Sequence, residues 1–259
     1  MIKEKENIEP QSKNRKQNVI IAIKDLHKTF GEDNEVLKGI NLNLHKGEDL
    51  VILGRSGSGK SVTIKCIVGL IAPDKGEIMV FDENILELKK NELNKIRARI
   101  GFLFQSGALY DSMSVRENLV FTLSKHKRDL SPEEIENEVM EALENVGLSD
   151  AVDKMPSALS GGMRKRIGLA RTLILKPEII LYDEPTTGLD TITSREISEL
   201  ILEIKKKQKT SAIIITHDMA CAKMTADRII VLKDGVIHAE GTYDELEKDE
   251  DKWVRSFFK

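Results

Sequence analysis

Short apolar runs and helix-spaced apolar positions follow one another along the chain and predict its secondary structure. Three apolar runs predict strands, at residues 18–24, 40–44 and 49–53. The third has the unbroken apolar character of a buried strand. Four apolar residues then recur at i, i+3, i+4 and i+7: Ile64, Ile67, Val68 and Ile71. This period predicts a helix directly after the buried strand.

The middle of the chain has the pattern of helices. Ser131, Pro132 and Glu134 predict a capping box with proline at the first helical position. One apolar stripe at helical spacing follows them: Ile135, Val139, Ala142, Leu143 and Val146. Gly147 is expected to end this helix. Residues from about 105 to 171 are therefore predicted to form a helical insertion.

Strands and helices alternate again after this insertion. Strands are predicted at 179–182 and 211–216, helices at about 163–175 and 194–207, and a hairpin at 228–239 that turns at Asp234-Gly235. The pattern as a whole predicts an α/β core that carries a helical subdomain. Residues 1–18 are expected to form a flexible charged tail, either fully solvated or in weak contact with anionic lipid. Residues 242–259 are expected to form a short C-terminal tail.

Composition narrows the class of protein. The 259 residues carry a net charge of −3 with both signs interspersed, which argues against a nucleic-acid-binding surface. No apolar run approaches the roughly 18 residues that span a bilayer, and residues 1–17 lack the apolar core of a signal peptide. Cys66 and Cys221 have no metal-site spacing and are interpreted as buried or free thiols of a reducing compartment.

A phosphate-binding loop follows the predicted buried strand. The segment matches G-x-x-x-x-G-K-[ST] without deviation, and with the next residue it comprises Gly54, Arg55, Ser56, Gly57, Ser58, Gly59, Lys60, Ser61 and Val62. Glycines allow backbone N–H groups to converge on phosphate oxygens, and the following helix adds its partial positive charge. Lys60 is expected to reach the β- and γ-phosphates, and the Ser61 hydroxyl is expected to bind Mg²⁺.

Two acids end a second apolar strand, in the segment Ile179-Ile-Leu-Tyr-Asp183-Glu184. Carboxylates delivered by a buried strand are costly unless they meet a cation or take part in chemistry. Asp183 is expected to lie on the Mg²⁺ side, directly or through water. Glu184 is expected to polarise the attacking water. With the phosphate-binding loop, this pair predicts a nucleoside triphosphatase.

The segment Leu159-Ser160-Gly161-Gly162-Met163 resembles the signature motif of ABC ATPases. Physically it is a second anion-binding helix N-terminus. The resemblance implies a P-loop NTPase fold of the ABC type, with an antiparallel β subdomain and the inserted helical subdomain. It also implies ATP and Mg²⁺ as cofactors, and a homodimer in which Ser160, Gly161 and Gly162 contact the ATP bound by the opposite subunit.

Other residues resemble further elements of the same family, in the same order along the chain. Phe30 resembles the aromatic residue that stacks on adenine. Gln105 resembles the glutamine that contacts Mg²⁺ and the attacking water, Asp190 the loop that crosses the dimer interface, and His217 the histidine that contacts the γ-phosphate. Taken alone, Phe30 would be a core residue and His217 a structural one. The resemblance covers residues 19–241, which are therefore expected to form the ATPase domain.

Three stretches look like the ATPase of Mla-type phospholipid transporters, which work with MCE-domain proteins. They are the loop ending in Val62, the segment Phe104–Tyr110, and the segment Leu159–Arg166. The aromatic C-terminal end, with Trp253, Phe257 and Phe258, also looks like that group, and its burial is expected against the chain's own body or a dimer mate. Apolar residues after Gln105 are expected either to form a groove for a permease or to fill the subdomain core: Leu109, Tyr110, Met113 and Val115.

The resemblance therefore implies the ATP-hydrolysing subunit of a transporter on the cytoplasmic side of the inner (plasma) membrane. Its expected partners are an integral-membrane permease and an MCE-type lipid-binding protein. Two alternatives stay open: the ATPase of an importer for a polar solute such as an amino acid, and a soluble ABC protein such as an iron–sulfur assembly ATPase. An ATPase that acts by binding alone is disfavoured, because Glu184 and His217 are both present.

Overall fold

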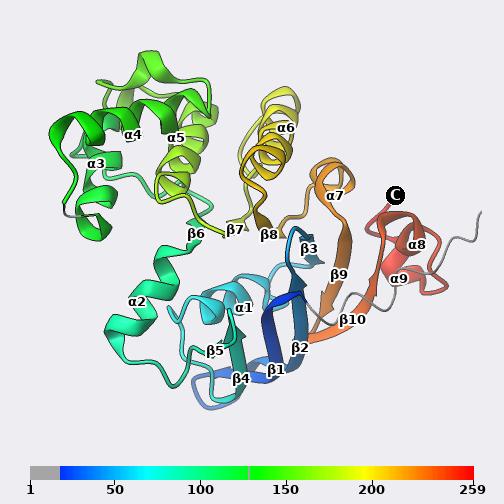
Figure 1. Cartoon of the computed structure of the whole chain (residues 1–259). Coiled ribbons are helices and arrows are strands. Elements are labelled where there is room, and N and C mark those ends of the chain that lie inside the picture. The colour runs from blue at the N-terminus through cyan, green and yellow to red at the C-terminus, as the bar shows by residue number, and fades with distance from the viewer. Residues whose placement is uncertain (1–17, 128) are drawn as a thin grey trace, which may run out of the picture.

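The computed structural model describes residues 18–127 and 129–259, so the predicted N-terminal tail lies, apart from Asn18, outside the described residues. A first sheet has four antiparallel strands in the order β2-β1-β4-β5. Its strands are β1 (Val19–Phe30), β2 (Asn34–His45), β4 (Lys75–Val80) and β5 (Glu83–Asn84). This sheet is the lower part of Figure 1. Strands β1 and β2 are much longer than the apolar runs that predicted them.

A second sheet has six strands in the order β10-β9-β3-β8-β7-β6. They are β3 (Asp49–Gly54), β6 (Ile100–Leu103), β7 (Ile179–Asp183), β8 (Ser211–Ile215), β9 (Arg228–Lys233) and β10 (Val236–Gly241). Neighbouring strands are parallel except at the β9–β10 hairpin. Strands β3, β7 and β8 are buried along their whole length, as in parallel sheets covered on both faces.

Helices α3 (Val115–His126), α4 (Pro132–Glu144) and α5 (Gly161–Leu173) form a lobe beside β6 and β7 (Figure 1). The remaining helices are α1 (Lys60–Ile67), α2 (Lys90–Ala98), α6 (Thr191–Gln208), α7 (Met219–Thr225), α8 (Tyr243–Glu247) and α9 (Lys252–Arg255), with short turns η3 (Ser149–Ala151) and η4 (Pro156–Ala158). Among the described residues, no helix is both long and apolar enough to cross a membrane.

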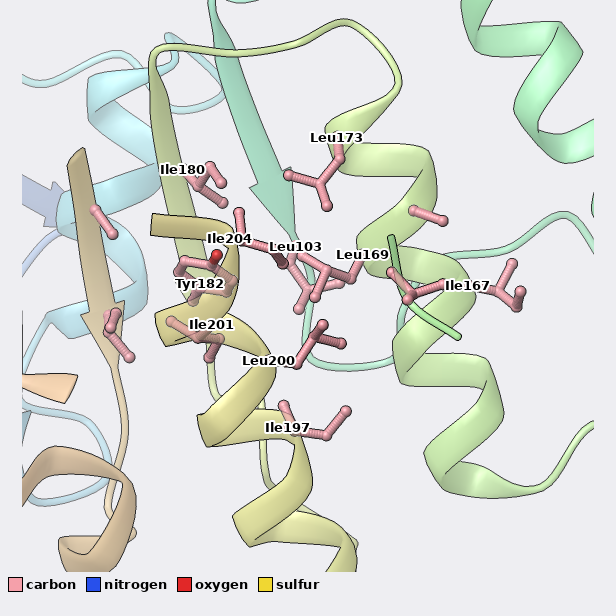
Figure 2. Close-up of a cluster of buried hydrophobic side chains, with 14 of the residues drawn as sticks. Leu103, Ile167, Leu169, Leu173, Ile180, Tyr182, Ile197, Leu200, Ile201 and Ile204 are labelled. Atoms are coloured by element: carbon pink, nitrogen blue, oxygen red, sulfur yellow. The ribbon is translucent and has the colours of Figure 1, made fainter. Parts of the chain in front are cut away.

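A continuous apolar core joins the helical lobe to the six-stranded sheet. Figure 2 shows Ile201 and Ile204 of α6, Leu169 of α5 and Leu103 of β6 gathered around Tyr182 of β7. Tyr182 is only 1% exposed, so this residue, which precedes the acid pair, belongs to the core. Because the side chains at the ends of β6 and β7 share this core with α5, the lobe and the strand ends are packed together.

The predicted cap and turn agree with the structure, whereas the outer ends of β1 and β2 and the end of the first helix do not. The capping box at Ser131 and Glu134 is present, and Asp234 and Gly235 both have positive φ at the hairpin turn. Helix α1, however, ends at Ile67, and Ile71 lies beyond it. Gly69 has a φ of +64°, and the N–H of Leu70 donates to the carbonyl of Lys65 over 2.9 Å. A glycine in the left-handed region therefore ends the helix before the apolar pattern does.

The C-terminal aromatic residues pack against the chain's own body. The rings of Tyr243 and Phe258 lie 5.0 Å apart, as do those of Trp253 and Phe257. The Lys233 ammonium lies 4.6 Å from the Trp253 ring centroid, and the Arg55 guanidinium lies 6.0 Å from it. Helix α9 thereby touches the phosphate-binding loop. Both cysteines are free and buried, and burial raises the pKa of each thiol to about 11.

Candidate functional site

A cavity of about 830 Å³ lies at the carboxyl ends of the parallel strands. Ligands of open α/β sheets bind at this edge because loops from several strands converge there. Gly54 ends β3, while Gln105, Glu184 and His217 follow β6, β7 and β8. The lining comprises Phe30, Asn34, Val36, Gly54, Ser56, Gly57, Ser58, Gly59, Lys60, Ser61, Val62, Gln105, Glu184, Thr187 and His217. The fold thus brings most of the predicted site residues into one cavity.

The phosphate-binding loop has the backbone that phosphate binding requires. Gly57 and Gly59 have φ values of +81° and +104°, and Gly59 caps the N-terminus of α1. A Cβ at Gly59 would lie 2.7 Å from a Leu37 methyl carbon, so no larger residue fits without movement. The Lys60 ammonium donates to the carbonyls of Gly54 and Arg55 over 2.8 and 3.0 Å. Burial lowers the pKa of Lys60, and the charges of Glu184 and Asp183 oppose that shift.

The loop and the acid pair meet through Ser61 and Asp183. The Ser61 hydroxyl donates to Oδ1 of Asp183 over 2.8 Å, and Asp183 is only 6% exposed. Hydroxyl and carboxylate oxygens suit Mg²⁺, which completes its octahedron with waters and phosphate oxygens. No group of three His, Cys, Asp or Glu residues that could hold a metal by itself occurs in the described part of the chain. The donor set therefore fits a Mg²⁺ that arrives with a nucleotide.

The hydroxyl of Ser58 also supports the interpretation that the loop binds an anion. Ser58 Oγ is buried and has no hydrogen-bond partner among the described residues. A Cβ at Gly54 would lie 2.6 Å from this oxygen and equally close to the carbonyl oxygen of Leu232. The loop therefore leaves room only for glycine at Gly54, and it keeps a hydroxyl without a partner beside the cavity. Buried polar atoms of this kind are rare unless a ligand or water completes them.

Glu184 lies at the cavity in a constrained conformation. Its φ is +53°, a region that non-glycine residues occupy at a cost in strain. Its Oε2 is 2.7 Å from Nδ1 of His217 and accepts a hydrogen bond from the Thr187 hydroxyl over 3.0 Å. Strain of this kind is typical of active sites, where the surrounding structure holds a group in one orientation. Glu184 and His217, predicted from separate motifs, are thus in direct contact.

Besides Arg55 and Asp183, four predicted residues do not line this cavity. Ser160 caps α5 and accepts a hydrogen bond from the Met163 N–H, while Asp190 caps α6 and accepts from the N–H groups of Ile192 and Thr193. Gly161 and Gly162 are the first residues of α5, and none of the four lines the cavity.

The segment Ser160–Gly162 at the start of α5 and the segment around Asp190 at the start of α6 lie next to each other. A Cβ at Gly161 would contact Leu189, and a Cβ at Gly162 would lie 2.6 Å from the Thr193 methyl carbon. Gly162 is therefore also required by packing between α5 and α6. Arg55, the remaining predicted residue, lines a separate small cavity with Trp253.

Sequence reasoning assigned no role to Asn34, Val36 or Thr187, which line the cavity, or to Lys165, which contacts its walls. Thr187 lies three residues after Glu184, so its position close to the acid pair was a usable signal. Asn34 and Val36 belong to the half of β2 that the apolar runs did not reveal. Lys165 gave no local signal, because its contacts come from segments distant in the sequence.

A groove of about 580 Å³ lies where the helical lobe meets β6. Its lining includes the aromatic residues Phe102, Phe104, Tyr110 and Phe121 together with Arg171. Tyr110 is 47% exposed and packs edge-on against Phe121 at 5.2 Å. Val115, by contrast, is fully buried in the core of the lobe. The alternative that these apolar residues fill the core is therefore correct for Val115, whereas Tyr110 faces the groove.

The chain is similar to known ATP-binding proteins of transporters. The family model described as "ABC transporter" matches residues 37–187. The chain is 41% identical over 214 residues to a probable ribonucleotide transport ATP-binding protein of Mycobacterium leprae, covering 83% of this chain and 61% of that protein. It is 37% identical over 255 residues to the chloroplastic protein trigalactosyldiacylglycerol 3 of Arabidopsis thaliana, covering 92% of this chain and 73% of that protein. It thus spans less than two thirds of the mycobacterial relative.

Among solved structures, the ATP-binding cassette MJ0796 is similar, in a dimeric post-hydrolysis state bound to ADP and phosphate. The TM-score is 0.79 at 34% identity, and the match covers 86% of this chain and 98% of that one.

Proposed function

Because this chain belongs to the ABC transporter family of ATP-binding proteins, we propose that it is the ATP-hydrolysing subunit of a membrane transporter. The observation that carries this proposal is the Glu184 carboxylate, which lines the cavity with Lys60 and is held by His217 and Thr187. An activity of this kind needs a phosphate-binding loop, a metal-binding pair and a base in one place.

Each residue has a distinct role in this proposal. The loop N–H groups and Lys60 hold the β- and γ-phosphates, and Ser61 and Asp183 hold Mg²⁺. When bound, Mg²⁺ neutralises charge that develops on the phosphate oxygens. Glu184 accepts a proton from the water that attacks the γ-phosphorus, and the bond from that phosphorus to the bridging β,γ-oxygen breaks, so that ADP leaves. His217 orients the Glu184 carboxylate and would contact the γ-phosphate, and Gln105 would contact the water and Mg²⁺. Phe30, which lines the cavity and is 40% exposed, stacks on the adenine.

The active unit in this proposal is a homodimer. Ser160 and Asp190 lie outside their own chain's cavity, at the exposed N-termini of α5 and α6. A helix N-terminus with free glycine N–H groups binds anions. We infer that Ser160, Gly161 and Gly162 bind the ATP of the opposite subunit and that Asp190 lies at the interface. The dimeric state of the MJ0796 structure supports this arrangement.

Residues 19–241 form the ATPase domain in this proposal, with the helical subdomain at about 105–171 and the C-terminal tail at 242–259. The domain docks on the cytoplasmic side of the plasma (inner) membrane, where the groove around Tyr110 receives a cytoplasmic segment of the permease. Exposed aromatic residues that line a hollow are common at protein interfaces, because they bury large areas at low conformational cost. Closure of the dimer around ATP is thereby transmitted to the membrane.

A charge placed at Tyr110 is expected to release the permease. Tyr110→Glu replaces an aromatic contact by a carboxylate that must be desolvated in the interface and that Arg171 offsets only in part, and such a change typically costs a few kcal/mol, about 10²-fold in affinity. Co-purification with the permease should fall accordingly, while ATP affinity and the Tm of the isolated chain stay close to those of the wild type.

Leu86→Glu is the matched control, because Leu86 is 40% exposed and lies beside β5, away from the helical lobe. It should leave co-purification intact. Equal retention of the permease by both variants would exclude this groove as the docking site.

The transported material is proposed to be a phospholipid, handed over by an MCE-type partner in the same complex. Support comes from the resemblance at Val62, Phe104–Tyr110 and Leu159–Arg166. The Arabidopsis relative adds support, because it is named after a galactolipid. The mycobacterial relative is named as a probable ribonucleotide transport protein, and ribonucleotides are polar solutes. An importer of a polar solute is therefore the second candidate.

Purification of the complex from native membranes separates these candidates. A multi-span permease together with phospholipid detected by mass spectrometry supports lipid transport. ATPase activity stimulated by an amino acid or nucleotide, in a complex without lipid, would assign the chain to polar-solute import. A chain that purifies without any permease would instead indicate a soluble ABC protein.

A further inference from the structure

Lys165 is a buried lysine whose ammonium contacts two main-chain carbonyls of the site. It is the fifth residue of α5 and is only 5% exposed. Its Nζ donates to the carbonyl oxygen of Gln105 over 2.5 Å and to that of Glu184 over 3.0 Å. Within the described residues it forms no salt bridge with a carboxylate. The chain therefore buries a positive charge whose hydrogen-bond partners are two neutral carbonyls.

Burial lowers the pKa of Lys165, and the charges of Glu184 and Asp183 oppose that shift only in part. Removing an ammonium from water is costly, and neutral carbonyls offset that cost only in part. An apolar side chain of similar length would avoid the cost of burying a charge, but it would take away the donor to both carbonyls. The two carbonyls, however, belong to Gln105 and Glu184, which come from loops after different strands and both line the cavity. The position of the charge is thus tied to the site rather than to the core.

The Glu184 backbone is held from both sides. Its N–H donates to the carbonyl of Ile215 on β8 over 2.9 Å, and its carbonyl accepts from Lys165. Between these two bonds the residue has a φ of +53°, which a non-glycine residue keeps only if its surroundings enforce it. The carbonyl also accepts a longer hydrogen bond from the Thr187 N–H, over 3.3 Å, so loss of the Lys165 bond would remove the shorter of its two donors and loosen the Glu184 peptide. The carboxylate would then move relative to His217 and to the water that it is proposed to activate.

We propose that Lys165 is a positioning residue for ATP hydrolysis, which holds the Glu184 backbone in its strained conformation and ties it to α5 and to the Gln105 loop. The inference rests on the proposed function, since it concerns the residue assigned there as the base. Helix α5 begins directly after Ser160, the residue proposed to reach the opposite subunit's ATP. A single side chain thus connects the element that contacts one ATP to the base that acts on the other.

Replacement by methionine removes the donor and retains the side-chain length. In the full chain, Lys165→Met is expected to lower kcat by about 10²-fold, the typical effect of displacing a catalytic group by about 1 Å. KM and ATP affinity measured by calorimetry should stay within about threefold, because the phosphate-binding loop is untouched. The Tm should change little, because removal of a buried charge offsets the loss of the two hydrogen bonds to the carbonyls. Lys165→Arg, which keeps donors and charge, should restore most of kcat.

Arg166→Met is the matched control. Arg166 is the next residue of α5, and it also donates to a main-chain carbonyl, that of Val146 in the helical lobe, in addition to an ion pair with Glu196. It should reduce kcat by less than about threefold. If Lys165→Met and Arg166→Met lower kcat and Tm to the same degree, Lys165 has only a structural role and the proposal is wrong.

A double-mutant cycle tests whether Lys165 acts through Glu184. In a Glu184→Gln background, Lys165→Met should cause no further loss of single-turnover hydrolysis, because the group that it positions is already gone. Two independent, multiplicative losses would overturn the proposal. A wild-type chain that shows no ATP hydrolysis, alone or with its permease, would instead refute the proposed function and this inference with it.

Discussion

Glu184→Gln is expected to bind ATP as tightly as the wild type and to lose most of its turnover. The amide is isosteric with the carboxylate and cannot accept a proton from water. Removal of a general base typically costs about 10²–10⁴-fold in rate. The phosphate-binding loop, Ser61 and Asp183 remain in place, so binding should be unaffected. Steady-state phosphate release and equilibrium binding of ATP, measured on the same preparation, give the two quantities.

Lys60→Ala provides the contrast to this variant. The Lys60 ammonium lines the cavity, and in this structure it contacts the carbonyls of its own loop. Its loss should weaken ATP binding itself, because a cation that contacts the β- and γ-phosphates is removed. The assignment of Glu184 as the base is wrong if its glutamine variant retains near-wild-type turnover. The division of roles is wrong if both variants lose binding equally.

A mixed dimer of two inactive variants is expected to regain hydrolysis. Ser160→Arg blocks the N-terminus of α5, and Lys60→Ala disables the phosphate-binding loop. If each ATP is bound by Lys60 of one subunit and Ser160 of the other, a heterodimer has one composite site with both lesions and one with none. The intact site should retain up to about half of the wild-type activity of the dimer, whereas each mutant homodimer should have little.

This experiment requires differently tagged subunits that are purified in two steps, so that only the heterodimer is assayed. Its control is the wild type paired with Ser160→Arg, which also contains one intact site and should show comparable activity. An assembled heterodimer without activity, next to an active control pair, would contradict the shared site. It would instead favour binding of Ser160 to the ATP of its own chain.

The parts of the site that could be predicted from sequence are those whose chemistry is local. The loop from Gly54 to Ser61 needs glycines at fixed spacing, and the acids at Asp183 and Glu184 end an apolar strand; both arrangements leave an unambiguous pattern. The Ser61–Asp183 hydrogen bond then follows once β3 and β7 lie in one sheet. Gly69, which ends α1 early, was equally evident in the sequence, but the apolar period extended the predicted helix past it to Ile71.

Lys165 was not predictable in the same way. Lys165 acquires its role only when β6 and β7 become neighbours and bring residues 105 and 184 to the same helix. The outer halves of β1 and β2 were not predicted, because polar residues such as Lys28 and Glu35 interrupt the apolar pattern there. Such strands are defined by pairing across a sheet rather than by a run of apolar residues. Pairing across a sheet also places Asn34 and Val36 at the cavity.

Trp253 is the only tryptophan in the chain, and its ring lies against Arg55 of the phosphate-binding loop. Indole emission depends on the charges and the water around the ring, so the intrinsic fluorescence of this protein comes from a position that adjoins the ATP cavity. The chain therefore contains its own optical reporter. Changes of the loop on nucleotide binding can be followed in real time by stopped-flow methods, without a dye or an engineered label, in the wild type and in each variant described above.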